Sequence, residues 1–213
     1  MYYIIETEID RKIMGNCYPQ IEVIEPSDVA DSLSSWVYPA DNTSFIITMH
    51  KKAKQTDFLN NLQISGASGF FISQKVKDIF DQFKLMQHKY YPTKVNGWDM
   101  PYYWIHCSEP KLTHLIDYNE STFFETKWTF KEKPIKLTSF NEYELLKKER
   151  GTSFGVSLEK TFSKNDYIKS LDLFEFLPLS GSELYISEKL KSALEQNHVT
   201  GFKTQKAENL TIR

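Results

Sequence analysis

The sequence is poor in several residue types, and each shortage removes a class of protein. Its 213 residues include only two cysteines, Cys17 and Cys107, which excludes a disulfide-stapled scaffold and predicts reduced thiols. Glycine and proline number 8 each, too few for collagen-like repeats or long disordered linkers. No apolar run approaches the roughly 20 residues of a membrane-spanning helix, and the first residues lack a signal-peptide core. These shortages predict a cytoplasmic globular protein with no membrane association.

Arginine is also scarce. Only Arg11, Arg150 and Arg213 are arginines among 26 basic residues, and the net charge is −2. Proteins that bind nucleic acids rely on arginine for paired hydrogen bonds to guanine and phosphate, and on a positive surface. The composition therefore argues against nucleic acid as a partner.

The acidic residues are unevenly distributed. Residues 1–50 contain eight of them against Arg11 and Lys12, so this segment carries −6 while residues 51–213 carry +4. One interpretation is a solvated acidic face, and the other is a surface for a basic protein partner. On the second interpretation, the candidate contact residues in this segment are Glu22, Glu25, Asp28 and Asp31.

Aromatic residues, in contrast, are abundant: 15 Phe, 12 Tyr and 4 Trp. Most are expected in core strands, including residues 2–9, 43–49 and 123–130, where Trp128 and Phe130 should share one face. Residues 89–107 predict a hairpin around the turn signal Asn96-Gly97. Trp98 and Asp99 follow that turn, and an exposed tryptophan there would be a favoured anchor for a partner.

Three serines mark helix starts. Ser73 precedes an apolar stripe of helical spacing that extends to Met86, Ser139 forms a capping box with Glu142, and Ser187 precedes a last helix. Strands and helices in this order predict an α+β fold. We expect mixed, mainly antiparallel sheets with a few packed amphipathic helices.

Two segments echo one another. Residues 71–77 (FISQKVK) match residues 185–191 (YISEKLK) almost position by position. Each copy predicts a short strand, a serine-capped helix and a return strand, so we expect two related strand–helix–strand units, unless the shared pattern is coincidence. We divide the chain into an acidic, strand-rich segment, 1–68, and an α+β region, 69–213, within one compact fold.

The chemical motifs are weak. Residues 151–155 match the G-x-S-x-G pattern around Ser153, but they follow a helix instead of opening one, which inverts the context of a nucleophile elbow. His106 and Cys107 are neighbours in a predicted strand, so their side chains should point to opposite faces. The histidines and cysteines fit no zinc spacing. We therefore expect no catalytic residue, no metal and no cofactor, and a hydrolase using Ser153 or Cys107 with a histidine stays as the alternative.

The echoing segments carry a family resemblance. FISQKVKDIF, and YISEKLKSALEQNHVTGF with its final Thr200-Gly201-Phe202, resemble segments shared by the immunity protein 11 family of bacteria, as do Tyr90-Tyr91-Pro92 and residues 116–121. The resemblance covers roughly residues 69–205. It implies a non-enzymatic antidote, encoded beside a polymorphic toxin delivered by contact-dependent or type VI-like secretion, that binds and blocks that toxin. A regulatory module of unknown ligand is the third hypothesis, and the oligomeric state stays open.

Overall fold

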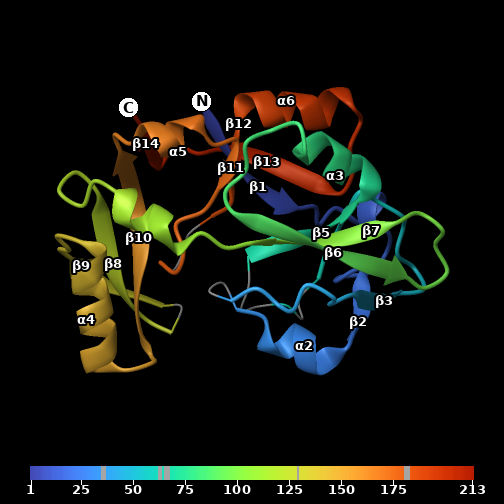
Figure 1. The fold of residues 1–213 in the computed structure, drawn as a ribbon, viewed down its shortest axis with the longest axis horizontal. Coiled ribbons are helices and arrows are strands. Elements are labelled where there is room, and N and C mark those ends of the chain that lie inside the picture. The colour runs from blue at the N-terminus through green and yellow to red at the C-terminus, as the bar shows by residue number, and fades with distance from the viewer. Residues whose placement is uncertain (35–36, 62–63, 65–67, 129, 180–182) are drawn as a thin grey trace.

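The computed structural model describes residues 1–34, 37–61, 64, 68–128, 130–179 and 183–213. These residues form three β-sheets with helices packed around them (Figure 1). Neighbouring strands are mostly antiparallel, and the parallel pairs are β3 with β6 and β10 with β14. The expected α+β class with mainly antiparallel sheets is confirmed.

The largest sheet has six strands in the order β2-β3-β6-β7-β5-β4. Their bounds are β2 (Ile21–Glu25), β3 (Phe45–Met49), β4 (Phe58–Leu59), β5 (Ser68–Ser73), β6 (His88–Val95) and β7 (Tyr102–Cys107). The hairpin expected over residues 89–107 is formed by β6 and β7. Pro92 has no amide hydrogen to donate to a neighbouring strand. It is tolerated inside β6 because pairing with β3 begins only at the next residue, Thr93.

The second sheet joins the two ends of the chain. Its order is β11-β12-β1-β13, with β1 (Tyr2–Thr7), β11 (Leu173–Phe174), β12 (Tyr185–Ser187) and β13 (Phe202–Lys206). The expected boundary after residue 68 falls at the start of β5. Strands before it are distributed over two sheets, β1 with the C-terminal strands and β2, β3 and β4 with β5 to β7.

The third sheet forms a separate lobe (Figure 1, left). It has the order β14-β10-β8-β9, with β8 (Thr122–Lys127), β9 (Phe130–Ile135), β10 (Phe154–Ser163) and β14 (Leu210–Ile212). A single strand over residues 123–130 was the wrong prediction, because Trp128 takes a left-handed backbone conformation (φ 58°) and turns the chain from β8 into β9.

The helices follow their capping signals. Their bounds are α1 (Arg11–Met14), α2 (Ser27–Ser32), α3 (Gln74–Phe80), the 3₁₀ helix η1 (Pro110–Leu115), α4 (Phe140–Arg150), α5 (Asp166–Ser170) and α6 (Glu188–Gln196). Ser73, Ser139 and Ser187 each accept a hydrogen bond from the backbone amide three residues on. The apolar stripe after Ser73 outlasts its helix: α3 ends at Phe80, and Met86 is buried beyond it.

Two apolar cores lie on the two faces of the six-stranded sheet. The larger contains Ile72, Ile105 and Cys107 from this sheet and continues through the second and third sheets. The smaller contains Phe71 and Trp104 and is closed by the α2 region. Successive side chains of β5 and β7 therefore point into opposite cores, as the two-residue period of a strand requires.

The echo in the sequence corresponds to a duplicated structure. In one unit the strands are ordered β4-β5-β7-β6, in the other β11-β12-β1-β13, and every neighbouring pair in both is antiparallel. In each unit a helix connects the two strands that flank a central strand, β7 or β1. Register makes Tyr102-Tyr103 of β7 equivalent to Tyr2-Tyr3 of β1, so the second unit begins at the N-terminus and is completed by the end of the chain.

Small contacts repeat as well. The amide of Gln74 donates to the carbonyl of Pro101 at 3.0 Å, and the amide of Glu188 donates to the carbonyl of Met1 at 3.1 Å. These residues hold equivalent places in the two units, at the first residue of each helix and just before each central strand. Two matching contacts at matching places identify a true structural repeat, because a shared capping pattern alone would not reproduce them.

Two aspartates bind the units to one another. Asp57, just before β4, accepts hydrogen bonds from the Ser73 hydroxyl at 2.8 Å in its own unit and from the Thr200 amide at 2.8 Å in the other. Lys75 Nζ lies 3.5 Å from the same carboxylate. Asp57 is only 7% exposed, so its charge is compensated by hydrogen bonds and an ammonium group instead of by bulk water.

Asp172, just before β11, makes the reciprocal contacts. It accepts hydrogen bonds from the Ser187 hydroxyl at 2.6 Å and from the Lys84 amide at 3.1 Å, in the loop after α3. Each aspartate therefore binds the serine that caps the helix of its own unit and a residue shortly after the helix of the other unit, Thr200 or Lys84. We call these two sets of contacts the reciprocal aspartate locks.

Replacing Asp57 by alanine should lower the free energy of unfolding by about 2–4 kcal/mol, because it removes a buried charged acceptor and leaves its donors unpaired. Asp172→Ala should cost less, since that side chain is only half-buried. Urea denaturation gives both values. Asp78→Ala, on the exposed face of α3, is the control and should change the stability by about 0.5 kcal/mol or less. An Asp57→Ala effect no larger than this control would contradict the role of the locks.

Candidate partner-binding site

Two adjoining hollows open at the end of the six-stranded sheet where β2 ends and β3 begins. The first, about 740 Å³, is bounded by the end of β2, the start of α2 and residues 42–46. The second, about 590 Å³, lies between the start of β3 and the β6–β7 turn. Ser44 and Ile46 line both, so the hollows form one continuous shallow surface.

The face of the sheet at this place is uncovered. Glu25 of β2 is paired with Ile46 of β3, and Ile46 with Lys94 of β6, so their side chains form a row across three strands. All three are exposed, whereas the neighbouring Ile24, Ile47 and Val95 are buried in the smaller core. Ile46 is 40% exposed and lies at the centre of this row.

The charge around this apolar centre is negative. The charged residues that line the two hollows are Glu25, Asp28 and Asp99, which are carboxylates, and Lys94. Trp98 also lines the second hollow. We call this set, with Ser44 and Ile46, the acidic surface. It could accept an apolar side chain flanked by basic groups.

The structure brings together four of the six residues predicted to contact a partner. Glu25 and Asp28 line the first hollow, and Trp98 and Asp99 line the second. Glu22 and Asp31 are exposed but line neither hollow. The Glu22 carboxylate lies 4.0 Å from His50 Nδ1, near the opposite end of β2, and Asp31 lies one turn further along α2.

Trp98 is less exposed than its polar neighbours predict. It is half-buried, because its ring packs on Tyr102 with 6.0 Å between centroids. Tyr102 is itself fixed by a 2.7 Å hydrogen bond from its hydroxyl to the Thr56 carbonyl. Trp98 therefore presents one rigid edge to the second hollow, which restricts its conformational freedom before any partner binds.

Ile46 is the central residue that the sequence interpretation missed. The sequence predicts a strand over residues 43–49 (TSFIITM), in which Phe45, Ile47 and Met49 alternate with Ile46 and Thr48. Phe45, Ile47 and Met49 are buried, so the two-residue period places Ile46 on the outer face. The alternation was therefore a usable signal for an exposed isoleucine.

The candidate nucleophiles are not arranged for catalysis. Cys107 is 1% exposed, and burial raises the pKa of its thiol well above its ordinary value, with the nearby Glu175 carboxylate raising it further. A reactive thiol needs the opposite shift and access to solvent. His106 and Cys107 contact opposite cores: His106 lies beside the rings of Tyr38 and Tyr91, while Cys107 belongs to the larger core.

Ser153 lies in the turn between α4 and β10, and its carbonyl accepts a hydrogen bond from the Trp128 amide at 2.8 Å. This helix-to-strand order is the inverse of a nucleophile elbow, as the sequence predicts. Among the described residues, the ring contacts and hydrogen bonds of the histidines involve neither the Ser153 hydroxyl nor the Cys107 thiol. The geometry offers no support for the hydrolase alternative.

In the described part of the chain, no group of three or more His, Cys, Asp or Glu side chains could hold a metal ion. No helix there has both the length and the apolar character needed to cross a membrane.

A comparison with protein-family models finds no match for this chain, and a comparison with curated proteins finds none either. A function is therefore inferred from the residues and surfaces described above.

His106 should make stability depend on pH. It has no solvent exposure, and burial lowers its pKa despite a backbone hydrogen bond at Ser34 that acts in the opposite direction. Below pH about 6.5 the unfolded chain binds a proton that the folded chain does not. The free energy of unfolding should therefore fall as the pH falls below about 6.5, by at most about 1.4 kcal/mol per pH unit for this group.

Urea denaturation from pH 7.5 down to pH 5 measures this dependence. His106→Phe should flatten the part of the curve just below pH 6.5, since phenylalanine binds no proton. His198→Asn, at an exposed position with a left-handed backbone, is the matched control, because it also removes one histidine but from outside the core. An identical pH dependence in the wild type and His106→Phe would refute the assignment.

Proposed function

We propose that this chain is an immunity protein that binds and neutralises a cognate bacterial toxin by protein–protein contact. The observation that carries the proposal is the acidic surface, where the carboxylates Glu25, Asp28 and Asp99 outnumber the single ammonium group of Lys94 around the exposed Ile46. The partner is a basic protein, and the chain acts in the cytoplasm of the toxin-producing cell or its siblings. The proposed mechanism involves no catalytic step.

The form of this surface suits a protein better than a small substrate. Small-molecule sites are usually concave cavities that enclose most of the ligand. Here the two hollows are shallow and continuous across Ile46, with carboxylates at their edges. An apolar centre with a charged rim is the usual anatomy of a protein interface.

The resemblance to the immunity protein 11 family supports the same function. The residues that carry it, FISQKVK and YISEKLK, form the serine-capped starts of α3 and α6, which pack against one another. These are structural parts of the duplicated scaffold. The resemblance therefore concerns the scaffold, and the acidic surface at its end supplies the proposed specificity for one toxin.

Charge and packing would act at different stages of binding. The carboxylates of Glu25, Asp28 and Asp99 attract a basic partner and raise the association rate, an effect that salt weakens. Ile46 and the held edge of Trp98 then contribute apolar contact, which determines the dissociation rate. This division predicts different kinetic effects for changes to the two kinds of residue.

Binding to the toxin encoded next to this chain tests the proposal. The two proteins should copurify, and coexpression should rescue cells from the toxin. A double variant, Glu25→Lys with Asp99→Lys, should weaken the affinity at least about tenfold, mainly through the association rate and most strongly at low salt. Surface plasmon resonance at several salt concentrations measures both rates.

Glu132→Lys with Glu149→Lys makes the same charge change on the separate lobe and is the matched control, expected to bind as the wild type does. Failure of the wild type to bind or neutralise the adjacent toxin would end the proposal and leave a regulatory module as the remaining interpretation. Full binding by the Glu25→Lys, Asp99→Lys variant would show that the toxin binds a different surface.

A further inference from the structure

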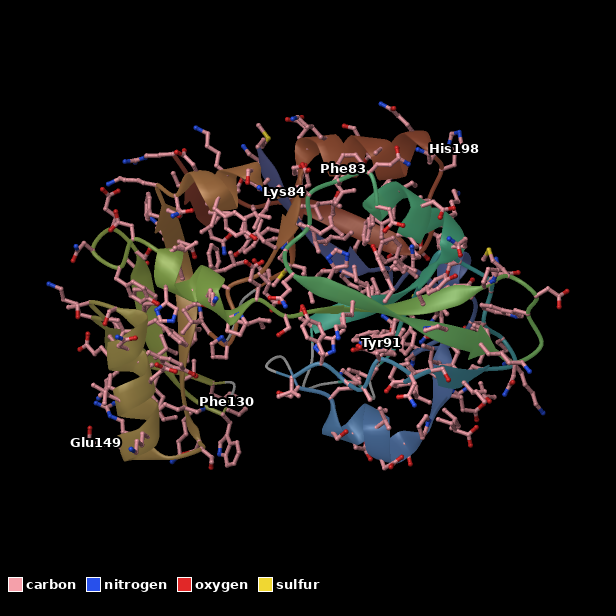
Figure 2. All side chains as sticks on the ribbon, viewed as in Figure 1. Phe83, Lys84, Tyr91, Phe130, Glu149 and His198 are labelled. Atoms are coloured by element: carbon pink, nitrogen blue, oxygen red, sulfur yellow. The ribbon has the colours of Figure 1, made fainter. Side chains whose placement is uncertain are left out.

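A second exposed apolar feature lies at the turn between β8 and β9, on the lobe formed by the third sheet. Trp128 is 67% exposed and Phe130 is 75% exposed. We call these two residues the aromatic tip. Phe130 lies at the lower end of the left lobe in Figure 2, on the side that faces α2, whereas the acidic surface belongs to the six-stranded sheet and the start of α2.

The aromatic tip combines a strained backbone with exposed apolar rings. Trp128 has φ 58°, a conformation that costs a residue with a bulky side chain about 1–2 kcal/mol and that glycine or asparagine adopts more readily. Both rings leave most of their apolar area in water, so they contribute little to the stability of the folded chain. Backbone strain of this kind is typical of functional positions.

The surroundings of the aromatic tip are basic. Residues 127–136 contain four lysines and one glutamate. Lys127 and Lys131 immediately flank the tip and are exposed. Lys131 pairs with Glu159 and Lys133 with Glu125, so the positive charge beside the rings is chiefly that of Lys127. Two aromatic rings flanked by ammonium groups are complementary to an apolar centre flanked by carboxylates.

That complementary surface is present on the same chain. The acidic surface presents Ile46 among three carboxylates, with Lys94 as its one ammonium group, and has hollows of about 740 and 590 Å³, each large enough for an aromatic side chain. In one molecule the aromatic tip belongs to the third sheet and the acidic surface to the six-stranded sheet, so the contact considered is one between two molecules.

We propose that the aromatic tip of one molecule docks into the acidic surface of a second copy of this chain. The rings fill the hollows beside Ile46, and Lys127 approaches the carboxylates. The contact joins two different surfaces, so it is heterologous. It uses the surface assigned above to the toxin but does not depend on toxin binding; where both occur, the second copy and the toxin compete.

Sedimentation velocity of the purified full chain tests the proposal. The wild type should associate as its concentration rises, and the association should weaken at high salt. Trp128→Gly with Phe130→Thr should weaken association at least about tenfold, because it removes both anchors. This variant should fold, since glycine relieves the left-handed backbone and threonine suits a strand. Urea denaturation checks its stability.

Two variants provide matched comparisons. Leu145→Ser removes an exposed apolar residue, 69% exposed, from α4 on the same lobe and should associate like the wild type. Glu25→Lys with Asp99→Lys should be monomeric. A mixture of this variant with Trp128→Gly, Phe130→Thr should form a one-to-one complex, because one component keeps the aromatic tip and the other keeps the acidic surface.

Several outcomes would overturn the proposal. A wild type that stays monomeric at every concentration would do so. Undiminished association of the Glu25→Lys, Asp99→Lys variant would also do so, because it would indicate contact between two tips. So would a monomeric wild type whose tip instead binds anionic lipid vesicles or a single-stranded oligonucleotide. A negative result leaves toxin binding unaffected, since that is measured in the separate copurification experiment.

Discussion

The reciprocal aspartate locks are the contacts on which the arrangement of this protein depends. Asp57 and Asp172 each fix the serine cap of one helix and the exit of the other helix, so neither duplicated unit is complete without its counterpart. An isolated strand–helix–strand unit would expose its apolar face, and packing α3 against α6 buries the two faces together. The locks add direction to that burial, because hydrogen bonds to a carboxylate require one geometry whereas apolar contact tolerates many.

The duplicated scaffold also explains how the two ends of the chain are used. The central strand of the first unit, β7, comes last in sequence among the strands of that unit. The central strand of the second unit, β1, comes first among its strands. Residues 2–7 are therefore held between β12 and β13, so the second sheet forms only when β1 meets strands that lie between Tyr185 and Lys206. The parts outside the repeat include β2, α2 and β3 on one side and the third sheet on the other. The exposed apolar residues of both proposed contact surfaces, Ile46 and the Trp128–Phe130 pair, lie on these additions.

The sequence predicted elements with local signals well and missed features that depend on tertiary contacts. The caps at Ser73, Ser139 and Ser187 and the turn at Asn96-Gly97 act within a few residues, and all appear in the structure. Apolar spacing could not predict the end of α3 at Phe80. Met86 continues the spacing and is buried, but it lies in the loop after the helix. The pairing of Asp57 and Asp172 with distant loops left no local pattern. The equivalence of Tyr2-Tyr3 and Tyr102-Tyr103 was visible as repeated letters, but it acquires meaning only through strand register.

The candidate site shows the same division between local and tertiary signals. Counting charge along the chain located Glu25 and Asp28, but only folding brings Trp98 and Asp99 beside them, some seventy residues away in sequence. A surface with one sign of charge repels copies of itself, so an acidic site alone would keep molecules apart. The proposed contact with the aromatic tip of a second copy would offset that repulsion, because Lys127 carries the opposite charge. Neutralising a toxin then requires the toxin to bind the acidic surface more tightly than a second copy does, which the greater contact area of a whole toxin can provide.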